Sequence, residues 1–457
     1  MGEATAGLES GGYERSRGRS ASYGVTAFKA GPEGKHDPNW KVRPCGGYVQ
    51  VNEQGQKIAQ PIQRPEKTVE RFAHARFFFK GDGIAAYNQV LLATGISREL
   101  LGIWTPLGVL QPTRLPFGWI NAAAVLGFRV LRMLAEIPER ELRDQLANHA
   151  DDFLGGSATL FEGPQSLYAT LRAFFTVCRK FCFTLNASKL RVGYKTETFI
   201  GRTIGDGRTC ISDDNLKPIR NMQIPTDKTS LRRVLGLCVM STPYIGCPVP
   251  KATYEGSYAE ITEPLRALTG KVPWSWRTDV EQRAFDRLKA AVLARPFLHA
   301  PDYSKRFRVR LDASDFGCGG FCYQTDVDYK PEESASIPVE EMKVVKLASQ
   351  SFSKTMVVKP VFYKEGYVIR WALGKQFYWY LIFSTFTTYV ETDHAPLEFM
   401  KNSMKGPVSA WASTELSQLR FLVIHIPGTL NVQSDALSRY PFIRVHAFHF
   451  HGSERMW

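Results

Sequence analysis

Long apolar runs, zinc-ligand patterns and internal repeats are all absent from this sequence of 457 residues. No apolar run is long enough to cross a bilayer, and no basic and then apolar segment follows Met1, so we expect neither a membrane anchor nor a secretory signal. The closest cysteine pairs, Cys178/Cys182 and Cys318/Cys322, lack a second pair or histidines at zinc-ligand spacing. These absences argue against a zinc site and a disulfide framework, and they predict an intracellular protein with free thiols.

Positive charge is in clear excess. The chain carries 58 Lys and Arg against 44 Asp and Glu, which gives a net charge of +14 and a pI near 9.3. Such a balance indicates a polyanionic partner, most simply a nucleic acid. The apolar content of 44% and the charged content of 22% are typical of a globular protein, and the length suggests two to four domains.

Helical and strand patterns alternate irregularly along the chain, which predicts mixed α+β domains. Residues 1–24 are rich in Gly, Ser and Arg and predict a disordered tail. Strand and helix patterns follow over residues 25–215, and residues 216–300 are mainly helical and basic. A second mixed unit is expected over residues 301–441, before a C-terminal tail at 442–457.

Three carboxylates in the first mixed unit suggest a metal site. Asp82 ends an apolar strand, and Asp151 and Asp152 lie at a predicted hairpin turn, where both can face one site. Three such groups would repel one another unless divalent cations held them, and Mg²⁺ suits oxygen ligands and phosphates. Two ions about 3.5–4 Å apart would serve an in-line attack on a phosphate. Tyr87 is placed to lie beside a nucleotide sugar, although a surface turn, a strand cap and a core aromatic remain the alternatives.

Four carboxylates in the second unit form a comparable set. Asp312 lies within an alternating strand, where an unpaired buried charge is costly. Glu365 lies early in a helix, Asp393 ends a strand and Asp435 begins a terminal helix. This set fits a two-metal phosphodiester hydrolase. Glu365 as a helix N-terminal charge and Asp435 as a cap are the alternatives.

Several longer motifs stand in an order typical of one protein family. The first half of the chain contains WKVRPCGGYVQVN, FKGDGIAAYNQV, RLPFGWINAAAVLGF, HADD and FTLNASKLRVGYKTETFIGRTI. The last third contains LDASDFGCGG, KEGYVIRWAL, TDHAPL and NVQSDALSR. From about Trp40 to Pro441 the chain resembles the reverse transcriptase and ribonuclease H region of gypsy-type LTR retrotransposon polyproteins.

The resemblance implies a right-hand polymerase followed by a ribonuclease H-like α/β domain. Residues 25–215 would form the fingers and palm, residues 216–300 the thumb and connection, and residues 301–441 the ribonuclease H-like domain. With no protease, integrase or nucleocapsid motif, the chain is expected to be a fragment or a reduced element.

The resemblance also implies roles for the polymerase residues. Asp82, Asp151 and Asp152 take the metal-ligand role, and Lys189 matches a lysine that protonates pyrophosphate. The substrate contacts are Arg43 for the triphosphate, Tyr87 for the sugar, and Phe117 and Gly118 for template and primer.

The implied function is an RNA-directed DNA polymerase with a fused ribonuclease H. Asp312, Glu365, Asp393 and Asp435 take the role of the hydrolase's acidic tetrad, and each active site would hold two Mg²⁺ ions, with Mn²⁺ as a substitute. Partners would be an RNA template, a DNA primer, dNTPs and an RNA–DNA hybrid, in a cytoplasmic particle or the nucleus. Backbone contacts would come from basic residues such as Arg232, Arg233, Lys289 and Arg308.

Departures from the family pattern keep two alternatives open. Gly47 and Val49 stand where the family has an aspartate and an arginine, and His149 stands where it has an aromatic residue. A missing arginine removes a charge-assisted triphosphate contact worth about 1.5–3 kcal/mol. The alternatives are a degenerate element that only binds nucleic acid, and a protein that retains only ribonuclease H activity.

Overall fold

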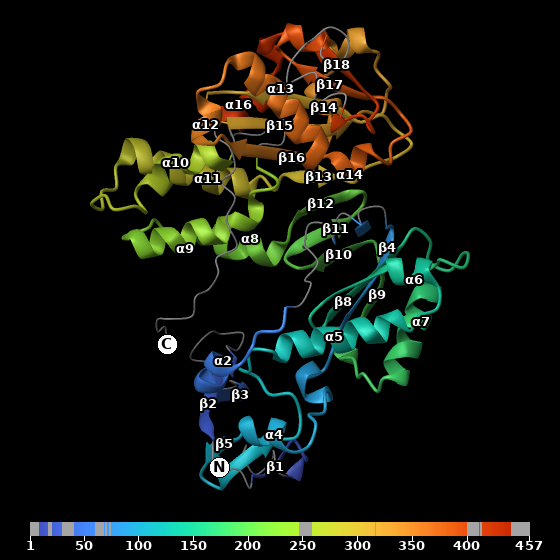
Figure 1. Cartoon of the computed structure of the whole chain (residues 1–457), viewed down its shortest axis with the longest axis vertical. Coiled ribbons are helices and arrows are strands. Elements are labelled where there is room, and N and C mark those ends of the chain that lie inside the picture. Colours follow the sequence, from blue (N-terminus) through green and yellow to red (C-terminus); the bar gives the residue numbers. More distant parts are fainter. Residues whose placement is uncertain are drawn as a thin grey trace. The chain divides into compact units, whose positions relative to one another are not determined.

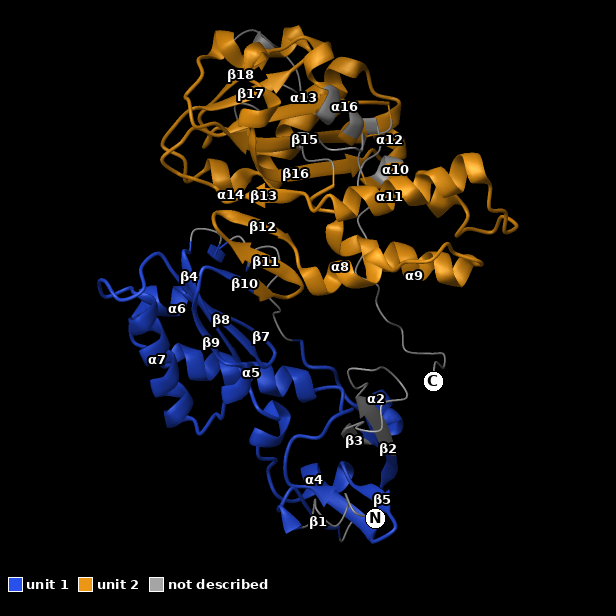
Figure 2. Cartoon of the chain, turned by 180° about the vertical axis from the view of Figure 1, so that it is seen from behind, with its two compact units in different colours: residues 1–197 blue, residues 198–457 orange. Residues whose placement is uncertain are grey.

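The structure is a computed structural model that divides into two compact units, residues 1–197 and 198–457 (Figure 2). It describes residues 9–16, 21–29, 41–59, 68, 71–72, 75–245, 258–315, 317–399, 411 and 414–439. No helix among these residues is long and apolar enough to cross a membrane. The division into fingers and palm, thumb and connection, and hydrolase remains a prediction.

A five-stranded sheet near the N-terminus has the strand order β1-β6-β5-β2-β3 (Figure 1). Its elements, with the two short helices that follow β3 and precede β5, are β1 (Tyr13–Arg15), β2 (Ser22–Lys29), β3 (Lys41–Gly47), α2 (Val49–Gln54), α4 (Ile96–Leu100), β5 (Ile103–Thr105) and β6 (Gly108–Pro112). Glu14 of β1 accepts hydrogen bonds from Arg98 at 3.0 Å and Gln111 at 2.7 Å. Because β1 and residues 22–24 at the start of β2 are paired in this sheet, the disordered tail predicted over residues 1–24 does not extend over either segment.

A second sheet in unit 1 has the order β7-β8-β4-β9. The elements around it are β4 (Phe77–Asp82), η1 (Ala86–Gln89), α5 (Ala122–Ala135), α6 (Arg140–Asp144), β7 (Leu146–His149), β8 (Asp152–Ser157), α7 (Leu167–Lys180), η2 (Ala187–Lys189) and β9 (Arg191–Tyr194). Helices α5 and α7 share one hydrophobic core with the sheet. Within it, the Phe174 ring of α7 lies 5.5 Å from Phe79 and 4.9 Å from Phe153.

The paired glycines after the acidic hairpin make room for this aromatic core. Gly155 is the register partner of Phe79, and a Cβ atom at Gly155 would come within 2.5 Å of the Phe79 ring carbon Cζ. A Cβ atom at Gly156 would lie 2.8 Å from Phe72. Because real Cβ atoms do not approach so closely, strand β8 requires glycine at both positions to pack beside β4.

Unit 2 begins with a small sheet and a group of helices that share a separate core. Its elements are β10 (Thr196–Phe199), which starts just before the unit boundary, β11 (Arg202–Gly205), β12 (Arg208–Ile211), α8 (Asp213–Arg220), α9 (Lys228–Cys238), η3 (Val239–Ser241), α10 (Tyr258–Ala267), the π-helical η4 (Thr278–Gln282), α11 (Arg283–Leu293) and β13 (Phe297–His299). Helix α9 begins where Asp227 accepts hydrogen bonds from the backbone N–H groups of Thr229 and Ser230, both at 2.7 Å. This capping satisfies N–H groups that have no partner inside the helix.

The rest of unit 2 is built on a five-stranded sheet of order β16-β15-β14-β17-β18, in which β14, β17 and β18 are parallel. Its strands are β14 (Arg308–Ala313), β15 (Gly317–Gln324), β16 (Lys343–Ser351), β17 (Thr388–Thr392) and β18 (Phe421–His425). The helical elements are η5 (Pro331–Ser336), η6 (Val339–Glu341), α12 (Lys354–Val357), α13 (Val361–Trp371), the π-helical η7 (Ala372–Gln376), α14 (Tyr378–Leu381), η8 (Ala395–Phe399), η9 (Gly428–Leu430) and α16 (Val432–Arg439). Residues of β14 and α13 contribute to the same buried core.

A buried ionic cluster crosses this sheet and overturns one expectation. Arg308 Nη1 lies 3.0 Å from Glu391 Oε1, Arg310 Nε lies 2.8 Å from Glu391 Oε2, and the Tyr323 hydroxyl donates to the same carboxylate at 2.9 Å. Arg308 is only 1% exposed. The prediction that Arg308 contacts a nucleic-acid backbone is therefore wrong. Its guanidinium is buried and forms an ion pair with Glu391, because a buried charge is costly without a partner of opposite charge.

Candidate active sites

Strand pairing brings the first set of carboxylates to one end of the β7-β8-β4-β9 sheet. Asp82, the last residue of β4, is the register partner of Asp152, the first residue of β8. The turn between β7 and β8 has Ala150 in the left-handed region at φ 54°, and the Asp151 carbonyl accepts a hydrogen bond from Gly83 N–H at 2.9 Å. Among the described residues, Asp312, Glu365 and Asp393 of unit 2 form the group whose potential ligand atoms all lie within 4.8 Å of one another, and Asp82, Asp151 and Asp152 do not form such a group. The hairpin carboxylates are therefore neighbours without forming so close a cluster.

Lys189 joins these carboxylates through an ion pair. Its Nζ lies 2.6 Å from Asp82 Oδ2, and η2 is held in place because the Asn186 backbone N–H donates to the Asp82 carbonyl at 2.7 Å. The hydrogen bond to Asp82 raises the pKa of Lys189, and the charges of Asp152 and Asp151 act in the same direction. Burial raises the pKa of Asp152; Lys80 opposes this shift, and Asp82 and Asp151 add to it. The positive charge of Lys189 thus offsets part of the negative charge of Asp82, Asp151 and Asp152, which the strand pairing places close together.

A cleft of about 1100 Å³ lies beside this acidic group within unit 1. Asp82, Asp151 and Lys189 line it together with Tyr87 and Phe117, whose ring centroids are 4.7 Å apart. Burial raises the pKa of the Tyr87 hydroxyl, and the negative charge of Asp151 raises it further. The structure therefore places an aromatic wall beside the carboxylates.

The loop that carries Phe117 is fixed by its neighbour Gly118. Gly118 has φ +98°, and a Cβ atom there would lie 2.5 Å from the carbonyl oxygen of Gly46 at the end of β3. Gly46 N–H donates to the Phe117 carbonyl at 3.3 Å, and Asn52 of α2 donates to the Gly118 carbonyl at 2.9 Å. A left-handed residue in so close a contact must be glycine.

Other residues around this cleft were partly missed by the sequence analysis. Arg114 and Arg129 also line the cleft and supply positive charge, and the sequence analysis gave neither a role, although Arg114 begins the RLPFGWINAAAVLGF motif. The backbone of Arg43 lies in β3, and its side chain is outside the described part of the structure. His149 ends β7 opposite Asp152 and is exposed.

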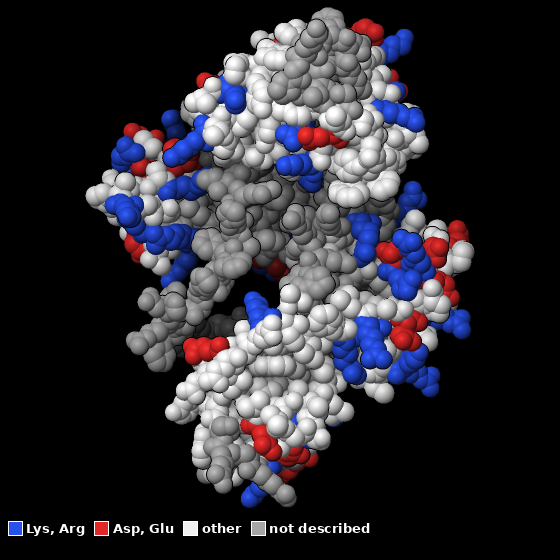
Figure 3. Space-filling view, viewed as in Figure 1, with Lys and Arg blue, Asp and Glu red and all other residues white. Residues whose placement is uncertain are grey.

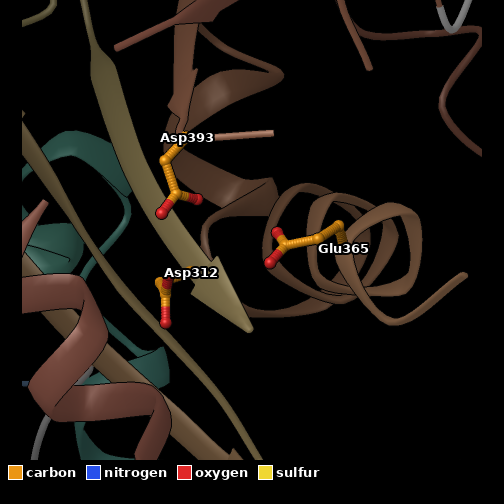
Figure 4. A group of neighbouring side chains, drawn as sticks. All are labelled: Asp312, Glu365 and Asp393. Carbon is orange, nitrogen blue, oxygen red and sulfur yellow. The ribbon is translucent and has the colours of Figure 1, made fainter. Parts of the chain in front are cut away.

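The second set of carboxylates is tighter and more buried. Asp312 of β14, Glu365 of α13 and Asp393 after β17 point toward one another, with potential ligand atoms within 4.8 Å (Figure 4). Asp312 is 5% exposed and Glu365 is 4% exposed. Burial raises the pKa of Glu365 to about 9, and the charges of Asp312 and Asp393 contribute to the shift. Ionisation of a buried carboxyl beside two other carboxyl groups is costly. A divalent cation bound between them would stabilise their ionised forms.

The predicted fourth member, Asp435, lies outside this 4.8 Å cluster. It belongs to helix α16, which contacts Asp312 through another of its residues. Ser438 of α16 donates a hydrogen bond to Asp312 Oδ2, and Asn431 Nδ2 lies 3.5 Å from Asp312 Oδ1. Helix α16 approaches this closely because Gly319, the register partner of Asp312, has no side chain. A Cβ atom there would lie 2.6 Å from the Ser438 backbone nitrogen. Sequence analysis missed Asn431 and Ser438, although both stand in the NVQSDALSR motif from which it took only Asp435.

Lys and Arg side chains gather on parts of the surface of both units (Figure 3). Figure 3 shows Lys and Arg side chains grouped over the part of its face occupied by α6 and α7, and again over the part occupied by α9 and α10. In α9, Arg232 Nη2 donates to the Thr269 carbonyl at 2.8 Å, and Lys289 of α11 donates to the Met222 carbonyl at 3.2 Å.

Comparisons with known proteins agree with these geometries. Over 395 residues, 86% of this chain and 29% of the relative, the sequence is 28% identical to the retrovirus-related Pol polyprotein from transposon 412 of Drosophila melanogaster. It is 24% identical over 402 residues to the Tf2-3 transposon polyprotein of Schizosaccharomyces pombe, covering 87% of this chain and 27% of that protein. This chain is a relative of retrotransposon Pol polyproteins. It spans about three-tenths of the length of these relatives.

The family comparison and the solved structures give the same result. Residues 276–388 match the RNase H-like domain found in reverse transcriptase, a range that contains Asp312 and Glu365 and ends before Asp393. The foamy viral protease-reverse transcriptase in complex with dsDNA has a TM-score of 0.69 at 17% identity, covering 93% of this chain and 81% of that one. The same viral protein with an RNA/DNA hybrid gives 0.64 at 17% identity, covering 92% and 52%. The predicted multidomain α+β fold with a ribonuclease H-like domain is therefore confirmed, as is the predicted kinship with a reverse transcriptase and ribonuclease H region.

Proposed function

We propose that this Pol relative is an RNA-directed DNA polymerase with a fused ribonuclease H, of the gypsy type. The observation that carries the proposal is the presence of two separate acidic sites in one chain. One, with its lysine, lines a wide cleft bounded by aromatic rings, and the other is a carboxylate trio on a ribonuclease H-like sheet, with Asp312 and Glu365 buried. The partners would be an RNA template, a DNA primer, dNTPs and an RNA–DNA hybrid. Solved complexes of the foamy viral protein with dsDNA and with RNA/DNA hybrid support nucleic acid as the partner class.

The residues fit divalent cations at both sites. Asp82, Asp151 and Asp152 would hold two Mg²⁺ ions in unit 1, and Asp312, Glu365 and Asp393, with Asp435 nearby on α16, would hold two in unit 2, with Mn²⁺ as a substitute. The carboxylates of both sites offer the oxygen ligands that these hard cations prefer. Bound there, the ions would activate the attacking oxygen and neutralise charge on the leaving one.

The chain's own groups would supply the remaining steps of polymerisation. Tyr87 and Phe117 would pack against the sugar and the nucleic acid at the wall of the cleft, so that the primer 3′-hydroxyl faces the α-phosphate. Lys189, whose raised pKa keeps Nζ protonated, would release Asp82 and give a proton to the leaving pyrophosphate. In unit 2, Ser438 and Asn431 would hold the Asp312 carboxylate toward the hybrid.

Purified protein given Mg²⁺, a primed RNA template and dNTPs should extend the primer and should cleave the RNA strand of a hybrid. Asp151→Asn should abolish extension and leave hybrid cleavage intact, and Asp312→Asn should do the reverse. Each variant serves as the folding control of the other.

A protein with ribonuclease H activity alone is the second candidate. The observation in its favour is that the unit 2 carboxylates converge, whereas those of unit 1 are more loosely arranged and one is tied to Lys189. Wild type that cleaves the hybrid in an Asp312-dependent way, yet never extends a primer, would establish this function. Protein that binds the hybrid and does neither would be a degenerate element.

A further inference from the structure

A stripe of aromatic and arginine side chains runs along the outer face of α7, away from its buried side. The stripe consists of Tyr168, Arg172, Phe175 and Arg179, which line a shallow groove of about 360 Å³ with Leu171 and Thr176. On the opposite side of the same helix, Leu167, Phe174 and Val177 are buried against the sheet. The stripe is therefore not needed to attach α7 to the fold.

The aromatic rings of this stripe are unusually open to solvent. Tyr168 is 55% exposed and Phe175 is 38% exposed, and Phe161 of the preceding loop is 71% exposed with its ring 6.2 Å from that of Tyr168. The outer face of an amphipathic surface helix ordinarily carries polar side chains. Two exposed rings on one helix face, with a third from the preceding loop beside them, call for a partner that buries them.

Charge decides which partner fits. Arg172 and Arg179 alternate with the rings, and among the described residues neither guanidinium has an ion-pair partner. Helix α7 contains no Asp or Glu. A partner must therefore present negative charge and flat apolar surfaces at the same time.

Spacing narrows the choice to a nucleic-acid strand. At a rise of about 1.5 Å per residue, the two rings of α7 are separated by about 10 Å along the helix, with one arginine between them and one beyond. Single-stranded nucleic acid offers phosphates to arginine and stackable bases to aromatic rings, a combination that needs no particular base sequence. We propose that the stripe of α7 binds a single-stranded segment of nucleic acid outside the catalytic cleft.

Binding can be measured without catalysis, so the result does not depend on either proposed activity. Full-length protein is kept in EDTA, the cleft is saturated with unlabelled primer–template duplex, and binding of a fluorescent oligo(dT) strand is followed. The same strand, carrying 5-bromouracil, is photo-crosslinked and the crosslinked peptide is sequenced. We expect a crosslink within residues 161–180.

Two variants separate the charge from the stacking. Arg172→Ala with Arg179→Ala should weaken binding about tenfold and reduce the salt-dependence slope by about 1.4, because each phosphate contact to a single strand contributes about 0.7. Phe175→Ala should weaken binding about tenfold, in the range for one stacked base, and leave the slope unchanged. Phe128→Ala on α5, whose side chain is also exposed (45%), and Arg140→Ala on α6, which is ion-paired with Asp144, are the controls, and each should change affinity less than twofold.

The proposal fails if the crosslinks map only elsewhere in wild type, a result that does not depend on how any variant folds. It also fails if the stripe variants and the controls bind alike. A stripe that captures an acidic protein segment but no oligonucleotide would likewise overturn it, and would mark a protein-docking surface.

Discussion

The two acidic sites of this chain solve the same electrostatic problem in opposite ways. In unit 1, the carboxylates lie at a hairpin on the wall of an open cleft, and the Lys189 ammonium compensates Asp82. In unit 2, the trio converges with Asp312 and Glu365 buried, and burial raises the pKa of Glu365 to about 9, so that this carboxyl is protonated at neutral pH. Repulsion between neighbouring carboxylates is relieved by a counter-ion at one site and by a proton at the other.

The difference matters for how each site becomes active. Metal binding in unit 1 requires the half-exposed Lys189 side chain to break its ion pair with Asp82. This is a local change that costs little free energy, because an exposed ion pair contributes little to stability. Loading unit 2 requires a deeply buried carboxyl to lose its proton. We therefore expect unit 2 to depend more steeply on pH and on its supporting hydrogen bonds than unit 1.

The largest effect is expected from Glu365→Gln. Removing this carboxylate should lower hybrid cleavage by about 10³-fold, since a divalent cation contributes several kcal/mol to the transition state. In metal-free protein the same change should raise the melting temperature at pH 8 and leave it unchanged at pH 4.5. The folded-state pKa of Glu365 is raised to about 9 from the ordinary 4.5, so its contribution to stability is intact below 4.5 and is lost as the pH rises toward 9.

Calorimetry in EDTA over this pH range is the measurement. A wild-type melting temperature that matches that of the variant at both pH values would contradict the proton-based account of unit 2. Primer extension by the variant reports whether unit 1 is intact.

The next effect is expected from Lys189→Met. Primer extension should fall by about 10²-fold, as for the loss of a general acid, while the Mg²⁺ concentration needed for half-maximal extension should fall because Asp82 is no longer paired. Lys189→Arg should keep the ion pair and the higher Mg²⁺ requirement. A Mg²⁺ titration of extension by both variants separates the two roles, and an unchanged requirement in Lys189→Met would remove the contrast between the sites.

A smaller loss is expected from Ser438→Ala. Without its hydrogen bond, Asp312 should be held less firmly, so hybrid cleavage should drop about tenfold and require more Mg²⁺, in the range for a residue that orients a metal ligand. Ser336→Ala, whose hydroxyl donates to the Glu333 carbonyl, is the control in the same unit. If added Mg²⁺ does not restore cleavage, Ser438 acts on stability and not on Asp312.

The smallest effect is expected at His149. Because the related family has an aromatic residue here, His149→Tyr should increase primer extension by a few fold through better packing beside the primer end. Hybrid cleavage provides the internal control. A rate that stays the same or falls would show that His149 does not limit unit 1.

Local pattern was a reliable guide where a residue's position depends on its own strand or helix. Asp82 ends an apolar strand, Asp312 lies within an alternating one, and Glu365 lies early in a helix, as predicted. The prediction for Arg308 was wrong because a strand in a sheet that is covered on both faces buries its polar residues as well as its apolar ones. The sequence could not show that Glu391 is the ion-pair partner of Arg308. Ser438 was missed because its role depends on a glycine in another strand.

The sequence by itself determined the order of the motifs, the sign of the charge and the elements that carry each carboxylate. These follow from residue type and from short-range periodicity, which a chain expresses before it packs. Only the tertiary structure decided which carboxylates converge, that Lys189 pairs with Asp82, and that α16 supports Asp312 through the space left by Gly319. Such contacts join residues up to 126 positions apart, as between Asp312 and Ser438, and depend on close packing that no local pattern encodes.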